Sequence, residues 1–516
     1  MENILLIISI FVTLMFFIYG YNCFYLIGAS RGYKIPKRDL PVNERPPVAV
    51  HLPVYNEKYV VGRLLESCTN MAESYGKELV RTMILDDSSD ETTQELEMLA
   101  RTYSSQGFRM EVIHRENRAG YKAGALQKAL ERTSEDYIVI FDSDFLPPPN
   151  FLMDIIPHIA IDEKVGIVQG RWSYLNREYN FITRAVAIGM NAHFLIEQPG
   201  RYASQCFLNF NGSGGVIRSK ALRDAGGWQS DTLAEDLDAS YRIQMKGYRV
   251  LFLRDVLAPC ELTPTITSFK RQQGRWACGS LQTAKKILPS LLREKTVGRK
   301  QKMQALVHLT YYLVHPLIFT SFLLALIAGI LGIDTIGLVI SIPAGLGQDP
   351  SRALEQITLA ILNTIAGQPF ILLAVTLLFL CWAAVWILYL IALRTEGLSI
   401  IRSIPNLIVI GIIGFGISIN NTIQAAKALL SSRKYSFERT PKYALKRSAD
   451  EWKNKKYQVP LNKTLYLEII AVVLCIITIG KALQQSNIGL VFILVFYMIS
   501  YAVVSILTFI HSGREG

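Results

Sequence analysis

Tyr137-Ile138-Val139-Ile140-Phe141-Asp142-Ser143-Asp144 decides the fold of this chain. Five apolar residues run directly into two carboxylates. The apolar run predicts a buried strand, whose carboxyl end then presents Asp142 and Asp144. Carboxylates on either side of a serine suit an octahedral Mg²⁺ or Mn²⁺ shared with a diphosphate, so both are candidate metal ligands. A solvated Asp-Ser-Asp turn is the alternative.

The same succession of apolar runs and helix-like runs extends through residues 45–300, which we expect to form one soluble unit. It predicts an α/β domain with a mostly parallel sheet, helices on its faces and ligands at the strand carboxyl ends. No G-x-G-x-x-G motif follows the first strand, which argues against a dinucleotide fold. The expected strand–helix pairs are 48–54 with 58–72, 79–85 with 91–103, and 110–114 with 123–132, before strand 137–141.

The hydropathy of the chain indicates a membrane protein. Half of the 516 residues are hydrophobic, and the mean hydropathy is +0.26. Residues 1–30 are uncharged from Asn3 to Ser30 and lack a basic leader and a cleavage site, so we expect a retained transmembrane helix. Residues 303–430 predict transmembrane or interfacial helices, and residues 464–511 predict two further transmembrane helices.

The net charge of +12 does not point to a nucleic acid partner, because the cations gather between hydrophobic segments. Residues 431–463 hold ten Lys/Arg against three Asp/Glu, which is typical of a cytosolic loop facing membrane lipids. If residues 45–300 are also cytosolic, the chain must cross the membrane an even number of times between them and the loop 431–463. We favour four, with spans at 403–426 and within 334–366; with two, 403–426 lies along the interface. The N-terminus is then outside the cell membrane and the C-terminus in the cytosol.

Seven scattered cysteines, none of them in a C-x-x-C pair, indicate neither a zinc site nor a disulfide framework. A reducing compartment fits this pattern.

Polar clusters follow the other expected strands. Strand 48–54 is followed by Tyr55 and Glu57, and strand 79–85 by Asp86 and Asp87, which suit a nucleoside hydroxyl or base. Lys122 opens a helix after the third strand, where free amides and a cation would suit phosphate oxygens. A solvated basic turn is the alternative for Lys122, although a cation there opposes the helix dipole.

Two clusters later in the soluble unit complete the set. Asp236 is a candidate general base, the alternative being a helix first turn rich in acids. Gln272 and Arg275 are spaced to share a helix face beside Trp276; the cation suits a diphosphate and the indole a sugar ring. An Arg-Trp anchor at the membrane surface is the alternative. In this order, and beside a membrane, the clusters point to sugar transfer from a nucleotide donor.

This set resembles the inverting family 2 glycosyltransferases of the cellulose synthase and plant glucomannan–mannan synthase type. The resemblance covers about residues 45–280, and Phe437–Lys442 is similar to the gating-loop pattern F-x-V-T-x-K, with Arg439 in place of valine. One departure is Ala234 where the family has threonine in T-E-D. The matching segments are P-V-Y-N-E (53–57), D-D-S-S-D (86–90), N-R-A-G-Y-K-A-G (117–124), D-S-D (142–144), F-N-G-S-G-G (210–215), E-D (235–236) and Q-Q-G-R-W (272–276).

The resemblance implies a cytosolic GT-A (nucleotide-diphospho-sugar transferase) domain inserted into a multi-pass membrane domain. It implies that Asp236 is the base, that Asp144 holds the metal, that Asp87 lies near the nucleobase and that Phe210–Gly215 borders the acceptor sugar. The residues expected to bind the nucleotide-sugar are Tyr55, Glu57, Asp86, Asp87, Lys122, Asp142, Gln272, Arg275, Thr440 and Lys442. The residues expected at the acceptor are Phe210, Gly212, Glu235 and Trp276.

We therefore expect a metal-dependent hexosyltransferase that builds a β-glycan from a UDP-glucose or GDP-mannose type of donor and extrudes it. Trp382, Trp386 and Tyr389 share one helix face and would line the path, the alternative being helix packing. A second hypothesis is addition of one sugar to a lipid acceptor: ceramide, diacylglycerol or polyprenyl phosphate. A third, non-enzymatic hypothesis is a transporter or receptor that binds a nucleotide.

Overall fold

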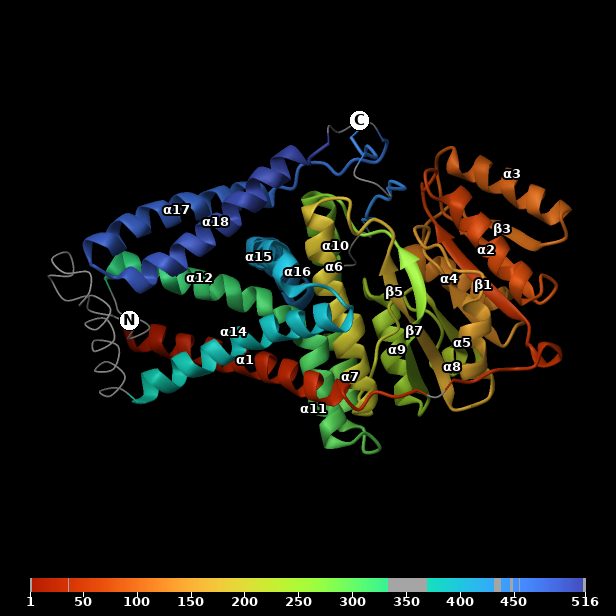
Figure 1. The fold of residues 1–516 in the computed structure, drawn as a ribbon, viewed down its shortest axis with the longest axis horizontal. Helices are drawn as coiled ribbons and strands as arrows, with labels where there is room; N and C mark the ends of the chain where they lie inside the picture. Colours follow the sequence, from red (N-terminus) through yellow and green to blue (C-terminus); the bar gives the residue numbers. More distant parts are fainter. Residues whose placement is uncertain are drawn as a thin grey trace.

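The computed structural model describes residues 2–35, 37–332, 369–430, 438–445, 449–453 and 455–513. A sheet flanked by helices occupies one end of the molecule, and long helices extend from it toward the other end (Figure 1). The N-terminus lies at the end of the long helices far from the sheet, whereas the last described residues return close to the sheet. The crossing expected within 334–366 and parts of the expected loop 431–463 lie outside the described residues.

The sheet has seven strands in the order β3-β2-β1-β4-β6-β5-β7. β1 pairs in parallel with β2 and β4, β2 with β3, and β5 with β7, whereas β6 runs antiparallel to β4 and β5. The predicted α/β domain is confirmed, and the sheet is mixed rather than purely parallel. The strands are β1 Val48–Val54, β2 Val80–Asp86, β3 Arg109–His114, β4 Tyr137–Ile140, β5 Val165–Tyr174, β6 Gly215–Arg218 and β7 Arg249–Cys260.

Helices cover both faces of the sheet, so each central strand is buried on both sides. Alternation along β1 sends Val48 and Val50 into the core beneath α2, α3 and α5, and Ala49 into the core beneath α4, α8 and α9. The helices of this unit are α2 Val61–Tyr75, α3 Thr92–Ser105, α4 Tyr121–Arg132, α5 Phe151–Ala160, α6 Phe181–Ala192, the π-helical η2 His193–Glu197, α7 Gln198–Ala203, α8 Ser219–Asp224 and α9 Glu235–Met245.

A long amphipathic helix, α10 (Ile266–Arg293), joins the α/β unit to the apolar helices and packs against α9, α11 and α16. The other helices of this part are α1 Glu2–Ser30, α11 Arg299–Thr310, the short η3 Tyr311–Leu313, α12 Val314–Leu331, α14 Pro369–Thr395, α15 Ile400–Gly416, α16 Ser418–Leu430, α17 Thr464–Gln484 and α18 Ile488–Ile510.

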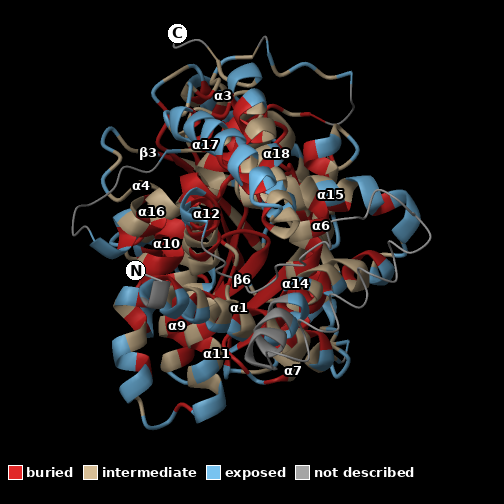
Figure 2. Cartoon of the chain, turned by 90° about the vertical axis from the view of Figure 1, so that its left-hand side faces the viewer, coloured by how far each residue is buried: buried red, intermediate tan, exposed pale blue. Residues whose placement is uncertain are grey.

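Within the described residues, four helical segments are long and apolar enough to cross a membrane: Ile4–Ser30, Arg299–Leu331, Thr464–Gln484 and Ile488–Ile510. α15 and α16 add a fifth if this pair, bent by 45°, counts as one span. Large apolar side chains are exposed along these helices, as the pale-blue residues on α17 show, whereas the strands are buried (Figure 2). An apolar surface of this extent fits contact with lipid.

Candidate active site

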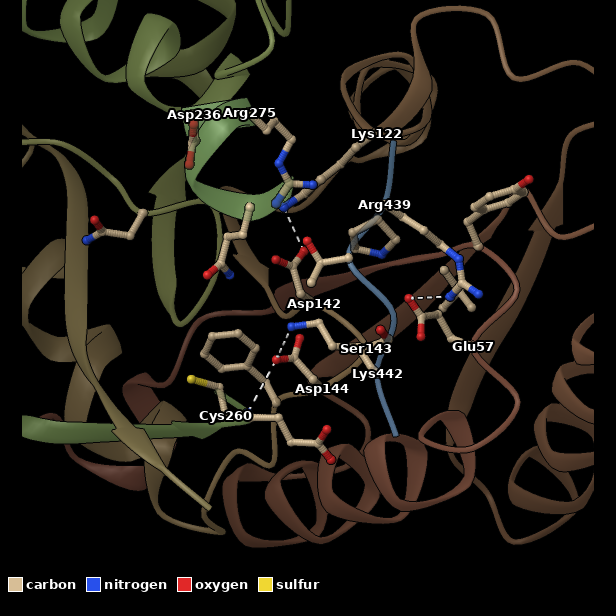
Figure 3. Close-up of a pocket in the computed structure, with 18 of the residues that line it drawn as sticks. Glu57, Lys122, Asp142, Ser143, Asp144, Asp236, Cys260, Arg275, Arg439 and Lys442 are labelled. Atoms are coloured by element: carbon tan, nitrogen blue, oxygen red, sulfur yellow. Dashed lines mark hydrogen bonds and ion pairs between the residues drawn. The ribbon is translucent and has the colours of Figure 1, made fainter. Parts of the chain in front are cut away.

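An open cleft of about 1310 Å³ lies at the carboxyl ends of β1, β2 and β4 (Figure 3). The starts of α4 and α9, one face of α10 and residues 439–442 complete its walls. The sequence-predicted residues that line it are Tyr55, Glu57, Asp87, Lys122, Asp142, Asp144, Glu235, Asp236, Gln272, Arg275, Trp276, Thr440 and Lys442.

Asp142 and Asp144 follow β4 and stand at the centre of the cleft. The backbone N–H of Asp142 donates to Ser213 Oγ at 2.9 Å, which ties the strand end to the glycine-rich loop before β6. Lys122 Nζ lies 2.6 Å from Asp142 Oδ1, and Lys442 Nζ lies 2.7 Å from Asp144 Oδ2 (Figure 3). Each carboxylate therefore has a cation of its own.

Lys122 lies in the first turn of α4, buried among oxygen atoms. Besides Asp142, its Nζ contacts Glu235 Oε1 at 3.7 Å and donates to the carbonyl of Gly212 at 3.1 Å. Burial acts to lower the pKa of Lys122, but the carboxylates of Asp142 and Glu235 outweigh it and raise the pKa. The amine thus stays charged and links the start of α4 to the start of α9.

Asp236 stands in the first turn of α9, where its Oδ1 accepts the N–H of Leu237 at 2.8 Å. Burial, together with the neighbouring charge of Glu235, raises the pKa of Asp236 from 3.8 to about 7. A carboxylate with such a pKa can take up and release a proton at neutral pH, which is what a general base requires.

The α10 face contributes Gln272, Arg275 and Trp276 to the same cleft. Burial lowers the pKa of Arg275, and the nearby carboxylates of Glu235 and Asp142 oppose that shift. α10 thereby adds a cation and an aromatic ring to the acidic centre.

Aromatic rings and cations alternate at the other end of the cleft. The Arg118 guanidinium lies 3.3 Å from the centre of the Tyr55 ring, and the Arg439 guanidinium lies 4.1 Å from that of Tyr457. Arg439 also pairs with Glu57 at 3.0 Å. Burial raises the pKa of Glu57 to about 8, although Arg439 acts in the opposite direction.

Asp87 and Thr440 both line the cleft, but only Asp87 is paired with another described side chain. Asp87 forms a bidentate pair with Arg115, with both N–O distances at 2.6 Å. The buried hydroxyl of Thr440 has no hydrogen-bond partner among the described residues. Thr440 therefore keeps a hydroxyl for a ligand.

Three predicted residues do not line the cleft. Asp86 is fully buried; its carboxylate accepts from Ser88 N and Thr93 Oγ1 and contacts His114 Nδ1, so it shapes the strand end from below. The Phe210 ring belongs to the core beneath α4, α8 and α9. Gly212 supports Asp236 and Lys122 from behind, because a Cβ there would lie 2.7 Å from Asp236 Oδ2.

The sequence prediction did not include Trp172 and Glu261, which line the cleft, and it covered Asn211 only as part of the matched segment Phe210–Gly215, which the resemblance implies borders the acceptor sugar. Glu261 follows the last residue of β7, accepts from Arg63 and from the N–H of Tyr443, and donates its own N–H to Asp144 Oδ2 at 3.3 Å. An acid after an apolar strand is the signal that identified Asp142, so it was available for Glu261. Trp172 carries no comparable local signal, whereas Asn211 belongs to the matched segment F-N-G-S-G-G.

The acids of the cleft fit a divalent ion that arrives with its ligand. The described residues contain no group of three or more His, Cys, Asp or Glu side chains that could hold a metal alone. Mg²⁺ is commonly bound through one or two carboxylates plus substrate phosphates and waters. The hard oxygens of Asp142 and Asp144 match that donor set.

The model of glycosyl transferase family group 2 matches residues 137–395, half of the chain. The chain belongs to this family. The model of glycosyl transferase family 2 also matches residues 49–218. The predicted family resemblance is thereby confirmed, and so is a GT-A-like α/β unit in a glycosyltransferase with apolar helices at both ends.

Plant enzymes are among the relatives of this glycosyltransferase. It is 34% identical over 256 residues to glucomannan 4-beta-mannosyltransferase 2 of Arabidopsis thaliana, covering 49% of this chain and 48% of the relative. It is 32% identical over 302 residues to probable glucomannan 4-beta-mannosyltransferase 9 of Oryza sativa subsp. japonica, covering 58% and 56%. The chain thus spans about half the length of the curated relatives it matches.

Among solved structures, the mannosyltransferase PcManGT from Pyrobaculum calidifontis, in complex with GDP-Man and Mn²⁺, is 22% identical with a TM-score of 0.46. That similarity covers 74% of this chain and 97% of the archaeal one.

Proposed function

We propose that this glycosyltransferase is a membrane-embedded, inverting enzyme that transfers a hexose from a UDP- or GDP-sugar to a growing β-glycan. The observation that carries the proposal is the meeting of Asp142, Asp144, Asp236 and Trp276 in one cleft. These residues come from β4, α9 and α10, so a solvated turn, a helix cap and a membrane anchor would not bring them together. The relatives named as glucomannan mannosyltransferases support the same conclusion.

Each reacting part has a residue of suitable chemistry. Asp142 and Asp144 would hold Mg²⁺ or Mn²⁺, and that ion supplies neutralisation of the leaving diphosphate when it is bound. Arg275 and Lys122 are placed to bind phosphate oxygens. Trp276 offers the acceptor sugar an aromatic face.

Asp236 takes the proton of the acceptor hydroxyl while that oxygen attacks the anomeric carbon and the bond to the diphosphate breaks. Direct attack by the acceptor oxygen is a single displacement, which inverts the anomeric centre.

The aromatic stripe on α14 supports extrusion of the product. The Trp382 and Trp386 rings lie 5.4 Å apart, and the Trp386 and Tyr389 rings 6.5 Å apart, so they form a continuous series. Trp382, at one end of this series, is 55% exposed. Replacing both tryptophans by leucine should shorten the product while nucleotide diphosphate release continues, and Phe492→Leu on α18 is the matched control. Polymers of unchanged length would argue for helix packing.

The proposal is tested with purified protein, UDP-glucose, UDP-GlcNAc or GDP-mannose, and Mg²⁺ or Mn²⁺. Nucleotide diphosphate release measures turnover, and product sizing separates a ladder of glycans from a single glycolipid. Asp236→Asn should abolish transfer to an added acceptor. If this variant matches the wild type under those conditions, Asp236 is not the base.

A further inference from the structure

The interface between α6 and α7 contains a feature that the proposed reaction does not use. The π-helical segment η2, His193–Glu197, joins the end of α6 to the start of α7. It brings His193 Nδ1 to 3.0 Å from Glu197 Oε2. π-helical turns are rare, and many occur at functional sites. The other ring nitrogen, Nε2, lies 3.2 Å from Oδ1 of Asn211, which lines the cleft. A carboxylate and an imidazole are therefore linked in series to an amide of the cleft wall.

The orientation of the Asn211 amide follows from its neighbours. Its Oδ1 accepts a hydrogen bond from Asn209 Nδ2 at 2.7 Å in addition to its contact with His193. Its backbone N–H donates to Gln169 Oε1 at 2.9 Å, so the residue is held at both ends. Turning the amide over would put its NH₂ group against the NH₂ group of Asn209, donor against donor.

This orientation leaves one group without a partner. Asn211 Nδ2 is buried and makes no hydrogen bond to any described residue. A buried unpaired donor is costly, so one on a cleft wall indicates an acceptor atom of a ligand. The next residue, Gly212, is the one that contacts Asp236 from behind. Asn211 and Asp236 thus line the same cleft, and the residue next to Asn211 lies against the proposed base.

We propose that Glu197 and His193 are positioning residues that hold the Asn211 amide so that it donates a hydrogen bond to a hydroxyl oxygen of the acceptor glycan. This proposal rests on the proposed function for the identity of its ligand. Glu197 orients the His193 ring by accepting from its Nδ1–H, the Nε2–H of the same doubly protonated ring donates to Asn211 Oδ1, and Asn211 Nδ2 contacts the sugar. A lipid acceptor that presents only a phosphate or a hydrocarbon chain offers no hydroxyl rim for this donor.

The test measures binding of mannohexaose and cellohexaose to the full-length protein by calorimetry, with and without bound nucleotide diphosphate. Asn211→Ala should weaken binding of the preferred hexasaccharide about tenfold, since one oriented hydrogen bond is lost. His193→Ala should give a similar loss, and His193→Gln, whose amide can still donate to Asn211, should recover most of it. The double variant His193→Ala/Asn211→Ala should bind as Asn211→Ala alone does, because His193 acts through Asn211.

Controls separate this role from a general loss of structure. Lys220→Ala removes an exposed i, i+4 pair with Asp224 on α8, outside the cleft, and should leave binding unchanged. Additive losses in the double variant, or a His193→Ala variant that binds like the wild type, would overturn the positioning role. So would a wild type that binds neither hexasaccharide. Because binding needs no turnover, an inactive protein that shows the expected pattern would overturn the proposed reaction and leave the positioning role standing.

Discussion

Gly212→Ala should inactivate the enzyme through Asp236, and the structure sets the size of the effect. The added Cβ would lie 2.7 Å from Asp236 Oδ2, whereas ordinary contact begins at 3.4 Å, so the carboxylate must retreat by the difference, about 0.7 Å. A misplacement of about 1 Å at a catalytic group can cost about 100-fold in rate. We therefore expect kcat to fall by about 25-fold or more.

The same substitution also strains the backbone, because Gly212 has φ +78°. Holding alanine in the left-handed region costs about 1–2 kcal/mol of stability. Gly247, in the turn between α9 and β7, provides the matched control: its φ is +88°, but a Cβ there meets nothing within 4 Å. Gly247→Ala should lose the same stability and keep its activity.

Nucleotide diphosphate release with added acceptor and thermal unfolding in detergent should be measured on both variants. The expected result is equal loss of stability and loss of activity only in Gly212→Ala. If both variants turn over at the wild-type rate, Gly212 does not set the place of Asp236. Equal inactivation of both would attribute the effect to strain.

Three further outcomes follow from charges in the molecule. Since burial raises the pKa of Asp236 to about 7 and a base must be ionised, kcat/KM should fall about tenfold per pH unit below that value; a flat profile between about pH 5.5 and 8.5 contradicts the assignment. Lys442→Met removes the cation that pairs with Asp144 at 2.7 Å, so the affinity of the protein for Mn²⁺ in the absence of donor should rise about tenfold, as measured by electron paramagnetic resonance. An unchanged affinity would show that Lys442 and Mn²⁺ do not compete for Asp144. Lys270 and Glu468 form a fully buried ion pair at 2.6 Å, so Lys270→Met leaves the Glu468 carboxylate buried without its cation and should lower the free energy of unfolding by about 3–5 kcal/mol. The double variant Lys270→Met/Glu468→Leu should recover most of this stability in thermal unfolding. Equal losses in the two variants would show that the unpaired carboxylate is not the cause.

Local pattern was sufficient for the first half of the sheet. β1 to β4 are four to seven residues long, rich in apolar residues and separated by helices, so alternation alone predicts them. β6 is four residues long and runs antiparallel, and its place between β4 and β5 depends on pairing across the chain. The break between α15 and α16 has a similar origin: a Cβ at Gly416 would lie 2.5 Å from the carbonyl of Ser500 on α18. No local pattern contains that contact.

Strand ends also identified most acids of the cleft, but not whether each side chain would point into the cleft or into the core. Asp86 and Asp87 are adjacent at the end of β2, and His114 at the end of β3 holds the first while Arg115 holds the second. Which of them reaches the cleft therefore depends on the register of two strands. Strand ends do not identify Arg439 and Lys442, which lie about 300 residues beyond the β4 acids, and Lys442 was expected only from the gating-loop resemblance.

That distance matters for how the cleft could open. Lys442 cannot leave the buried Asp144 without stranding a negative charge, unless another cation takes its place. Arg439 is under a weaker constraint, because Glu57, with a pKa of about 8, can take a proton when the guanidinium departs. Under the proposed function, Asp142 and Asp144 would hold the ion that accompanies the diphosphate, and its charge would compensate Asp144 while Lys442 binds phosphate oxygens.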